Sequence, residues 1–226
     1  MMKRLTLSFF LLLFLGSALY AQKGEAPADP QVPQPSRIAL VKTYTYRKEK
    51  SDEELSPEQK KARAFLEQMA PRLLKVEVVK GGEVSKESQR YSNGTSVEVW
   101  KWDEYTFKVD PANPQRIGVS SPNMRTGEEP REEASDAAIF SEFSWVNKEA
   151  FRGREVRNGA GVLVYQAGDV SAWVDEATRL PLVFRTASMQ VNYQYKERPT
   201  EDLKLPERFL KRLEAIKRAW RGQQPL

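Results

Sequence analysis

The chain has 226 residues, with 36 Lys and Arg against 31 Asp and Glu, and it contains neither cysteine nor histidine. The lack of these two residue types excludes disulfides, Ser-His-Asp triads, Cys-His pairs and zinc sites built on thiolates or imidazoles. The side chains that remain for catalysis or metal binding are carboxylates, Lys and Tyr. The sequence has no EF-hand loop or Gly-rich phosphate loop that would organise them. We therefore expect a non-enzymatic protein with no cofactor and no metal.

The first 21 residues have the pattern of a secretory signal peptide. Lys3 and Arg4 precede an apolar run over 5–15, and small residues follow up to Ala21. A membrane anchor is the alternative, but a spanning helix needs about 20 apolar residues and polar residues follow too soon. We therefore expect cleavage after Ala21 and a mature protein that is periplasmic or otherwise exported. Its small positive charge does not favour a nucleic-acid partner.

Residues 22–36 predict a disordered or extended linker. They contain four prolines among Ala, Gly and charged residues, a composition that buries little apolar surface. One domain is then expected over 37–226. Ile38, Leu40 and the segment 43–46 indicate its first strand.

The segment 56–70 predicts a helix of about four turns. Ser56 is a suitable N-cap, Pro57 suits the first helical position, and Gln59 completes a capping box. An apolar face follows at helical spacing, and Pro71 ends the helix. The residues of this face are Ala62, Phe65, Leu66 and Met69. Such a face either packs in the core or forms a lid over a cavity.

Strands and tight turns follow this helix. Val76, Val78 and Val79 precede a Gly81-Gly82 turn, and Asn93-Gly94 is typical of a hairpin. The other predicted strands are 95–102, 105–109, 117–119, 152–157, 161–166, 170–175, 180–186 and 188–195. The last five form an antiparallel meander. Between the two groups, 123–136 predicts an acidic loop and 137–143 a short helix.

The chain closes with a predicted amphipathic helix over 206–221. Its apolar stripe consists of Phe209, Leu213, Ile216 and Trp220, and six basic residues outnumber two acidic ones. The stripe favours packing on the sheet with the charged face in solvent. Contact of the basic residues with an anionic membrane surface is the alternative.

Aromatic side chains are concentrated in the predicted strands. They are Trp100, Trp102, Tyr105, Phe107, Trp173, Phe184, Tyr193 and Tyr195. If the sheet curves around a helix, inward-facing aromatics would line an apolar cavity that takes an acyl chain. Alternation along a strand defines a face but not an empty space, so an ordinary core explains the same pattern.

Carboxylates offer a third hypothesis, glycoside hydrolysis by a pair across a cleft. The candidates are Asp103, Glu104, Asp110, Asp169, Asp175 and Glu176. Most of them lie at predicted turns, where Asp is favoured for local hydrogen bonds, so we favour the structural explanation.

The C-terminal half carries a family resemblance. The matching residues are Gly153, the strand 162–165, the segment 173–182 (WVDEATRLPL), Pro199 and the segment 203–206 before the last helix. In particular, Asp175, Thr178, Leu180 and Pro181 match a strand–turn–strand pattern. This part of the chain, about 150–210, resembles the lipoprotein-carrier (LolA-like) superfamily of lipoprotein chaperones, lipid carriers and a lipid-sensing domain.

The resemblance implies an α+β fold: a strongly curved antiparallel β-sheet, an incomplete barrel, with helices covering its concave face. It implies a lipid- or lipoprotein-binding protein of the bacterial cell envelope that holds acyl chains in an apolar cavity. The candidate cavity and lid residues are Phe65, Leu66, Met69, Trp100, Trp102, Phe107, Trp173, Phe184, Tyr193 and Tyr195. The alternative is an envelope sensor or protein-interaction module whose cavity is filled by its own side chains.

Overall fold

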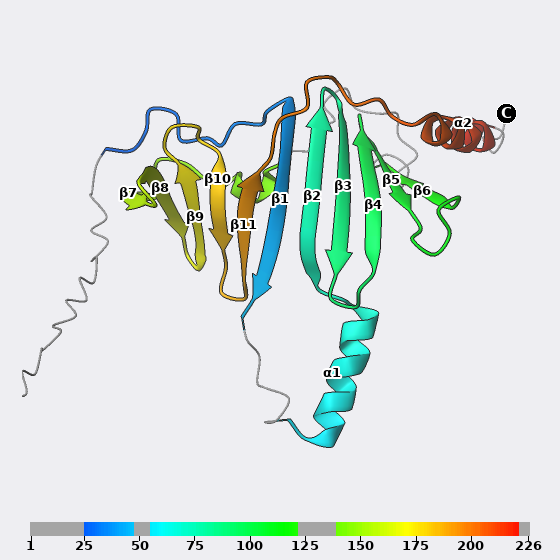
Figure 1. Ribbon diagram of the computed structural model, residues 1–226, viewed down its shortest axis with the longest axis horizontal. Coiled ribbons are helices and arrows are strands. Elements are labelled where there is room, and N and C mark those ends of the chain that lie inside the picture. The colour runs from blue at the N-terminus through cyan, green and yellow to red at the C-terminus, as the bar shows by residue number, and fades with distance from the viewer. Residues whose placement is uncertain (1–24, 48–54, 122–138, 222–226) are drawn as a thin grey trace, which may run out of the picture.

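A computed structural model describes residues 25–47, 55–121 and 139–221 (Figure 1). The predicted signal peptide and the acidic loop predicted for 123–136 lie outside these residues. The expectations for those two segments therefore stay predictions.

The described part is dominated by one open antiparallel sheet of eleven strands, joined by two α-helices and a short 3-10 helix. The strand order is β6-β5-β4-β3-β2-β1-β11-β10-β9-β8-β7, so β6 and β7 form the two edges and the sheet does not close. The strands are β1 (Arg37–Tyr46), β2 (Leu73–Gly81), β3 (Val84–Tyr91), β4 (Ser96–Trp102), β5 (Tyr105–Val109), β6 (Ile117–Ser120), β7 (Phe151–Arg157), β8 (Ala160–Ala167), β9 (Val170–Asp175), β10 (Pro181–Arg185) and β11 (Met189–Tyr195). The sheet-dominated α+β class expected from the sequence is confirmed.

Pairing of the first strand with the last joins the two halves of the sheet. β1 lies between β2 and β11 and is antiparallel to both. Each half is otherwise a meander of neighbours in sequence, β2 to β6 on one side and β7 to β11 on the other. The meander predicted for 152–195 is confirmed.

The register fixes which side chains share a face. Directly opposed residues point the same way, and side chains alternate along a strand. The register across the sheet places Trp100 and Trp173 on one face, here named the tryptophan face. Tyr193, opposite Lys42 of β1, lies on the other, here named the tyrosine face.

The larger core lies on the tyrosine face over β1, β2 and β7–β11. The segment 139–150, which includes the 3-10 helix η3 (Ser141–Phe143), covers this face with Phe140, Phe143 and Val146. Val32 of the Pro-rich segment joins the same core at 8 % exposure, and Gln34 accepts a hydrogen bond from the backbone N–H of Phe140. The described part of the Pro-rich segment is thus extended but packed on the domain.

The smaller core lies on the tryptophan face at the other end of the sheet. Helix α2 (Glu207–Arg221) packs there on β3–β6 through Phe209 and Leu213, both almost fully buried. These two residues confirm the packing expected for the C-terminal helix, whereas the side chain of Trp220 is outside the described part. The two halves of one sheet are therefore covered on opposite faces.

Helix α1 (Pro57–Met69) connects β1 to β2 and extends beyond the ends of the strands (Figure 1). The predicted capping box is present: the Ser56 hydroxyl accepts from Gln59 N at 3.2 Å, and Gln59 Oε1 accepts from Ser56 N at 3.0 Å. No residue of this helix is buried. Its apolar face is therefore not part of either core.

Candidate functional site

The ten side chains expected at a cavity lie in three different regions. Trp100, Trp102, Phe107 and Trp173 are on the tryptophan face, whereas Phe184, Tyr193 and Tyr195 are on the tyrosine face. Phe65, Leu66 and Met69 are on α1. The seven sheet aromatics do not share a face, so they do not line one common cavity. A role for each in ligand contact stays a prediction.

The aromatics of the tyrosine face are covered by the chain itself. The Phe143 ring lies 5.7 Å from that of Phe184 and 5.5 Å from that of Tyr193, and the Phe140 ring lies 6.1 Å from Tyr193. Tyr195 Oη donates to the carbonyl of Pro181 at 2.6 Å. Side chains of 139–150 therefore occupy the space over this face.

A buried polar network holds η3 on the same face. Glu142 Oε1 accepts from Lys42 Nζ at 2.7 Å and from Tyr193 Oη at 2.6 Å, and Lys42 Nζ also donates to the carbonyl of Ile139. Burial, followed by the nearby Glu142 carboxylate, raises the pKa of Tyr193 far above its ordinary value. The Tyr193 hydroxyl thus stays protonated and donates to the carboxylate.

The aromatics of the tryptophan face near α2 are packed around one residue. The Phe209 ring lies 5.6 Å from Trp100 and 5.2 Å from Phe107, and Trp102 stacks on Tyr105 at 6.5 Å. Burial, with a hydrogen bond to Glu104, raises the pKa of Tyr105 to about 12. These side chains belong to the smaller core.

Trp173 lies apart on the same face, toward the β7 edge. Its indole is flanked by the guanidinium groups of Arg157, at 4.8 Å from the ring centre, and Arg185, at 5.3 Å. Cation–π contacts of this kind contribute about 0.5–1 kcal/mol each at exposed sites and more where the groups are desolvated. They explain how a tryptophan is 9 % exposed on a face that α2 does not reach.

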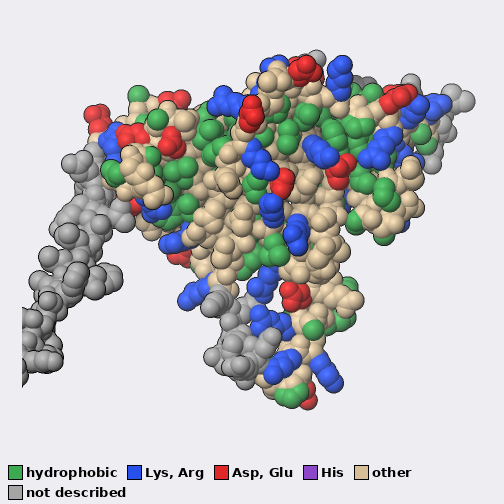
Figure 2. Space-filling model, viewed as in Figure 1, with side chains coloured by type: hydrophobic (Ala, Val, Ile, Leu, Met, Phe, Trp, Pro, Cys, Tyr) green, Lys and Arg blue, Asp and Glu red, His purple; other side chains and the backbone are tan. Residues whose placement is uncertain are grey.

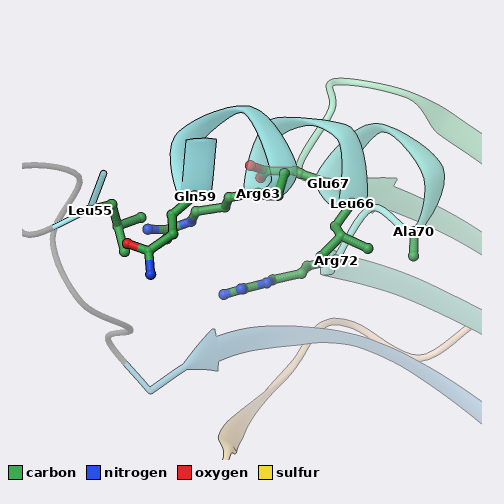
Figure 3. Close-up of a pocket in the computed structure, with 8 residues that line it drawn as sticks. Leu55, Gln59, Arg63, Leu66, Glu67, Ala70 and Arg72 are labelled. Atoms are coloured by element: carbon green, nitrogen blue, oxygen red, sulfur yellow. The ribbon is translucent and has the colours of Figure 1, made fainter. Parts of the chain in front are cut away.

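An open cavity lies along α1 and is bounded on the other side by Arg72, in the connection to β2 (Figure 3). It has a volume of about 600 Å³. One wall is apolar and the rest is polar, and the described residues that line it are Leu55, Gln59, Ala62, Arg63, Leu66, Glu67, Ala70 and Arg72. Of the three apolar α1 side chains expected at a cavity, only Leu66 is among them.

The apolar stripe of α1 is exposed to solvent. Phe65, Leu66 and Met69 are 62 %, 63 % and 68 % exposed, and Lys60, Lys61 and Arg63 lie on the same helix. Single exposed apolar residues are common on protein surfaces, but an adjacent group of large ones marks an interaction site. Sequence reasoning identified these residues; their exposure could be read only from the structure.

The carboxylates considered for catalysis make local contacts. Asp110 Oδ1 accepts from the backbone N–H of Ala112 at 2.9 Å, Glu176 pairs with Arg154 at 2.8 Å, and Glu104 accepts from Ser121 at 2.9 Å. Within the described ranges, no group of three or more acidic side chains has the geometry of a metal site.

The turn between β9 and β10, which contains the residues of the family resemblance, has the hydrogen bonds that its Asp and Thr predict. Asp175 Oδ1 accepts from both the backbone N–H and the hydroxyl of Thr178, at 2.7 Å each. Arg179 then adopts a positive φ of 63°, and Pro181 opens β10. These contacts explain the motif by turn formation, which is common to many folds.

No protein-family model matches the chain, and no curated protein matches it in sequence. The LolA-like resemblance therefore rests on the motif residues alone. Among the described residues, no helix is both long enough and apolar enough to span a membrane.

Proposed function

We propose that this protein is an exported, non-enzymatic binding protein of the bacterial cell envelope that holds acyl chains of a lipid or lipoprotein. The observation that carries the proposal is the cavity of about 600 Å³ beneath an α-helix that buries none of its residues. Ligand pockets typically range from about 300 to 1,000 Å³. The volume is thus adequate for part of a lipid.

The cavity wall suits an amphiphile. Leu55, Ala62, Leu66 and Ala70 offer an apolar surface, and each methylene buried there contributes about 0.8 kcal/mol. At the polar part, the cationic side chains of Arg63 and Arg72 outnumber the carboxylate of Glu67. An acyl chain with an anionic head group therefore complements the lining.

The unburied helix supports a lid role in the same proposal. A lid must leave its closed position without unfolding the domain, and such elements come from the least stable parts of a fold. Closing α1 over a bound chain would bury Leu66 and the rest of the apolar cavity wall, and it would place one helix over the ligand as the family resemblance implies.

The test is a titration with a fluorescent fatty-acid probe in the absence of membranes. We expect Leu66→Asp to weaken probe binding at least about tenfold, because the carboxylate would lie in the cavity wall. Phe65→Asp is the matched control: the neighbouring residue is equally exposed but does not line the cavity. Equal affinity in wild type and Leu66→Asp, or an equal loss in both variants, would contradict the proposal.

A second candidate is favoured by the tyrosine face. Phe140 and Phe143 fill the space over Phe184 and Tyr193. This packing supports the alternative proposal, an envelope sensor or interaction module whose cavity is filled by its own side chains. Absence of probe binding by a folded wild-type protein would favour this alternative.

A further inference from the structure

The outward side of α1 has a different character from the side that lines the cavity. Phe65 and Met69 are one turn apart, so their side chains are neighbours on the helix surface. Both are more than 60 % exposed, and neither lines the cavity. These two side chains therefore require an explanation beyond the ligand cavity.

The helix itself buries none of its residues within the described chain. Isolated helices of fewer than about 12–15 residues are marginal in water, and most helices in proteins gain their stability from packing an apolar face. α1 has 13 residues, a capping box and no buried side chain. A surface outside the chain would supply the missing burial.

Charge identifies the chemistry of that surface. The described segment 55–72 has four basic residues, Lys60, Lys61, Arg63 and Arg72, against the two carboxylates of Glu58 and Glu67. At 100° per residue, Lys61 borders the apolar stripe beside Phe65, and Arg63 borders it beside Leu66, where it also lines the cavity. Glu58 lies seven residues before Phe65 on the line of the stripe, in the first turn of the helix. Basic residues along both borders of an apolar stripe are typical of helices that lie in the interface of an anionic bilayer.

The position of the helix permits this contact. α1 projects from one end of the sheet, and Lys and Arg side chains gather on and beside this projection (Figure 2). We propose that α1 is a membrane-docking element: Phe65 and Met69 insert into the interface of a bilayer rich in anionic lipid, and the flanking basic side chains contact its head groups.

This proposal goes beyond acyl-chain binding and does not depend on it. The cavity wall and the docking surface are two sides of one helix with Arg63 between them. Leu66 reports on the cavity, and Phe65 and Met69 report on docking. Loss of vesicle binding with normal fatty-acid probe binding would contradict docking alone. The reverse result would contradict the proposed function alone.

The experiment is flotation of the protein with phosphatidylcholine vesicles that contain or lack roughly 30 % phosphatidylglycerol. This anionic lipid gives the vesicle surface a strongly negative potential. Wild type is expected to float with the anionic vesicles and to dissociate as salt is raised. Phe65→Asp and Met69→Asp should each weaken binding at least about tenfold, and Lys61→Gln about fivefold. Circular dichroism confirms that each variant is folded.

Two controls make the result decisive. Val156→Asp replaces an apolar residue that is 65 % exposed on the edge strand β7, far in the sheet order from the strands joined to α1, and should bind as wild type does. Lys211→Gln with Arg212→Gln tests the basic helix α2. Failure of wild type to float, equal loss in Val156→Asp, or loss in the α2 variant but not in the α1 variants would overturn the proposal.

Discussion

Glu142 illustrates how single residues hold the tyrosine face closed. Its carboxylate is bonded to Lys42 and Tyr193 of two adjacent strands, and it belongs to the 3-10 helix that covers them. Without it, Lys42, at 11 % side-chain exposure, would keep only the Ile139 carbonyl among the acceptors described above, and the Tyr193 hydroxyl would lose its acceptor. Removing one member of a buried charge pair is costly for this reason.

We expect Glu142→Ala to lower the free energy of unfolding by about 2–3 kcal/mol, less than for a fully buried pair because the site is partly exposed. Urea denaturation measures the change. Glu67→Ala, at an exposed position of α1, should change it by less than about 0.5 kcal/mol. Similar values for the two variants would show that the network contributes little.

Phe209 anchors α2 to the tryptophan face. It is fully buried between Trp100 and Phe107, whereas its neighbour Leu210 is 39 % exposed. Phe209→Ala should therefore cost about 3–5 kcal/mol, and Leu210→Ala less than about 1 kcal/mol. Thermal or urea unfolding compares the pair. A loss under about 1 kcal/mol for Phe209→Ala would mean that α2 is not held by this contact.

Some features at the residue scale were predictable because the side chains concerned form hydrogen bonds with backbone groups only a few residues away. The Ser56 cap and the Asp175–Thr178 turn are both present. The partners of Trp100 and Tyr193 were not predictable. Alternation assigns a side chain to one face of its own strand, but the register between strands decides which faces coincide. A common cavity for both residues was expected, and the register places them on opposite faces.

At the scale of elements, the periodic segments were predicted with small boundary differences. The five C-terminal strands, the two helices and the β4–β5 hairpin all lie where alternation or helical spacing indicates them. β3 was missed because its sequence, VSKESQRY, is polar on both faces. It is a strand because β2 and β4 pair with it on either side, a tertiary effect that its own sequence does not show.

The isolation of α1 leads to an element-scale prediction. Ser56→Ala removes the N-cap and should destabilise the helix by about 1 kcal/mol. Because the helix buries nothing, amide hydrogen exchange within α1 should accelerate about fivefold while the strands are unaffected. Equal acceleration in β1 and β2 would show instead that α1 unfolds together with the sheet.

For the molecule as a whole, one sheet is stabilised by two cores on opposite faces. The cover of the larger core comes from the segment 139–150 and the Pro-rich segment, and that of the smaller core from α2. The sequence predicts the apolar stripe of α2 but not which face it covers, because that choice depends on the long connection from β11 across the strand ends.

Buried tyrosines predict how stability depends on pH. Burial raises the pKa of Tyr44, Tyr193 and Tyr195 well above the ordinary value of 10.0. Above that pH the unfolded chain loses these protons and the folded chain keeps them, so the free energy of unfolding falls as pH rises. We expect a loss of at least about 1 kcal/mol per pH unit above pH 10, reduced in Tyr193→Phe. The free energy of unfolding should be measured from about pH 9.5 to about pH 11.5, a range that spans the ordinary tyrosine pKa of about 10. A value that does not change over this range would contradict the prediction.

The central claim is that the protein holds acyl chains beneath α1. The most direct test is native mass spectrometry, followed by lipid extraction, on protein that has been exported and purified without detergent. We expect a stoichiometric lipid in wild type and its loss in Leu66→Asp. A lipid-free mass for folded wild type, together with no binding of added fatty-acid probe, would contradict the claim.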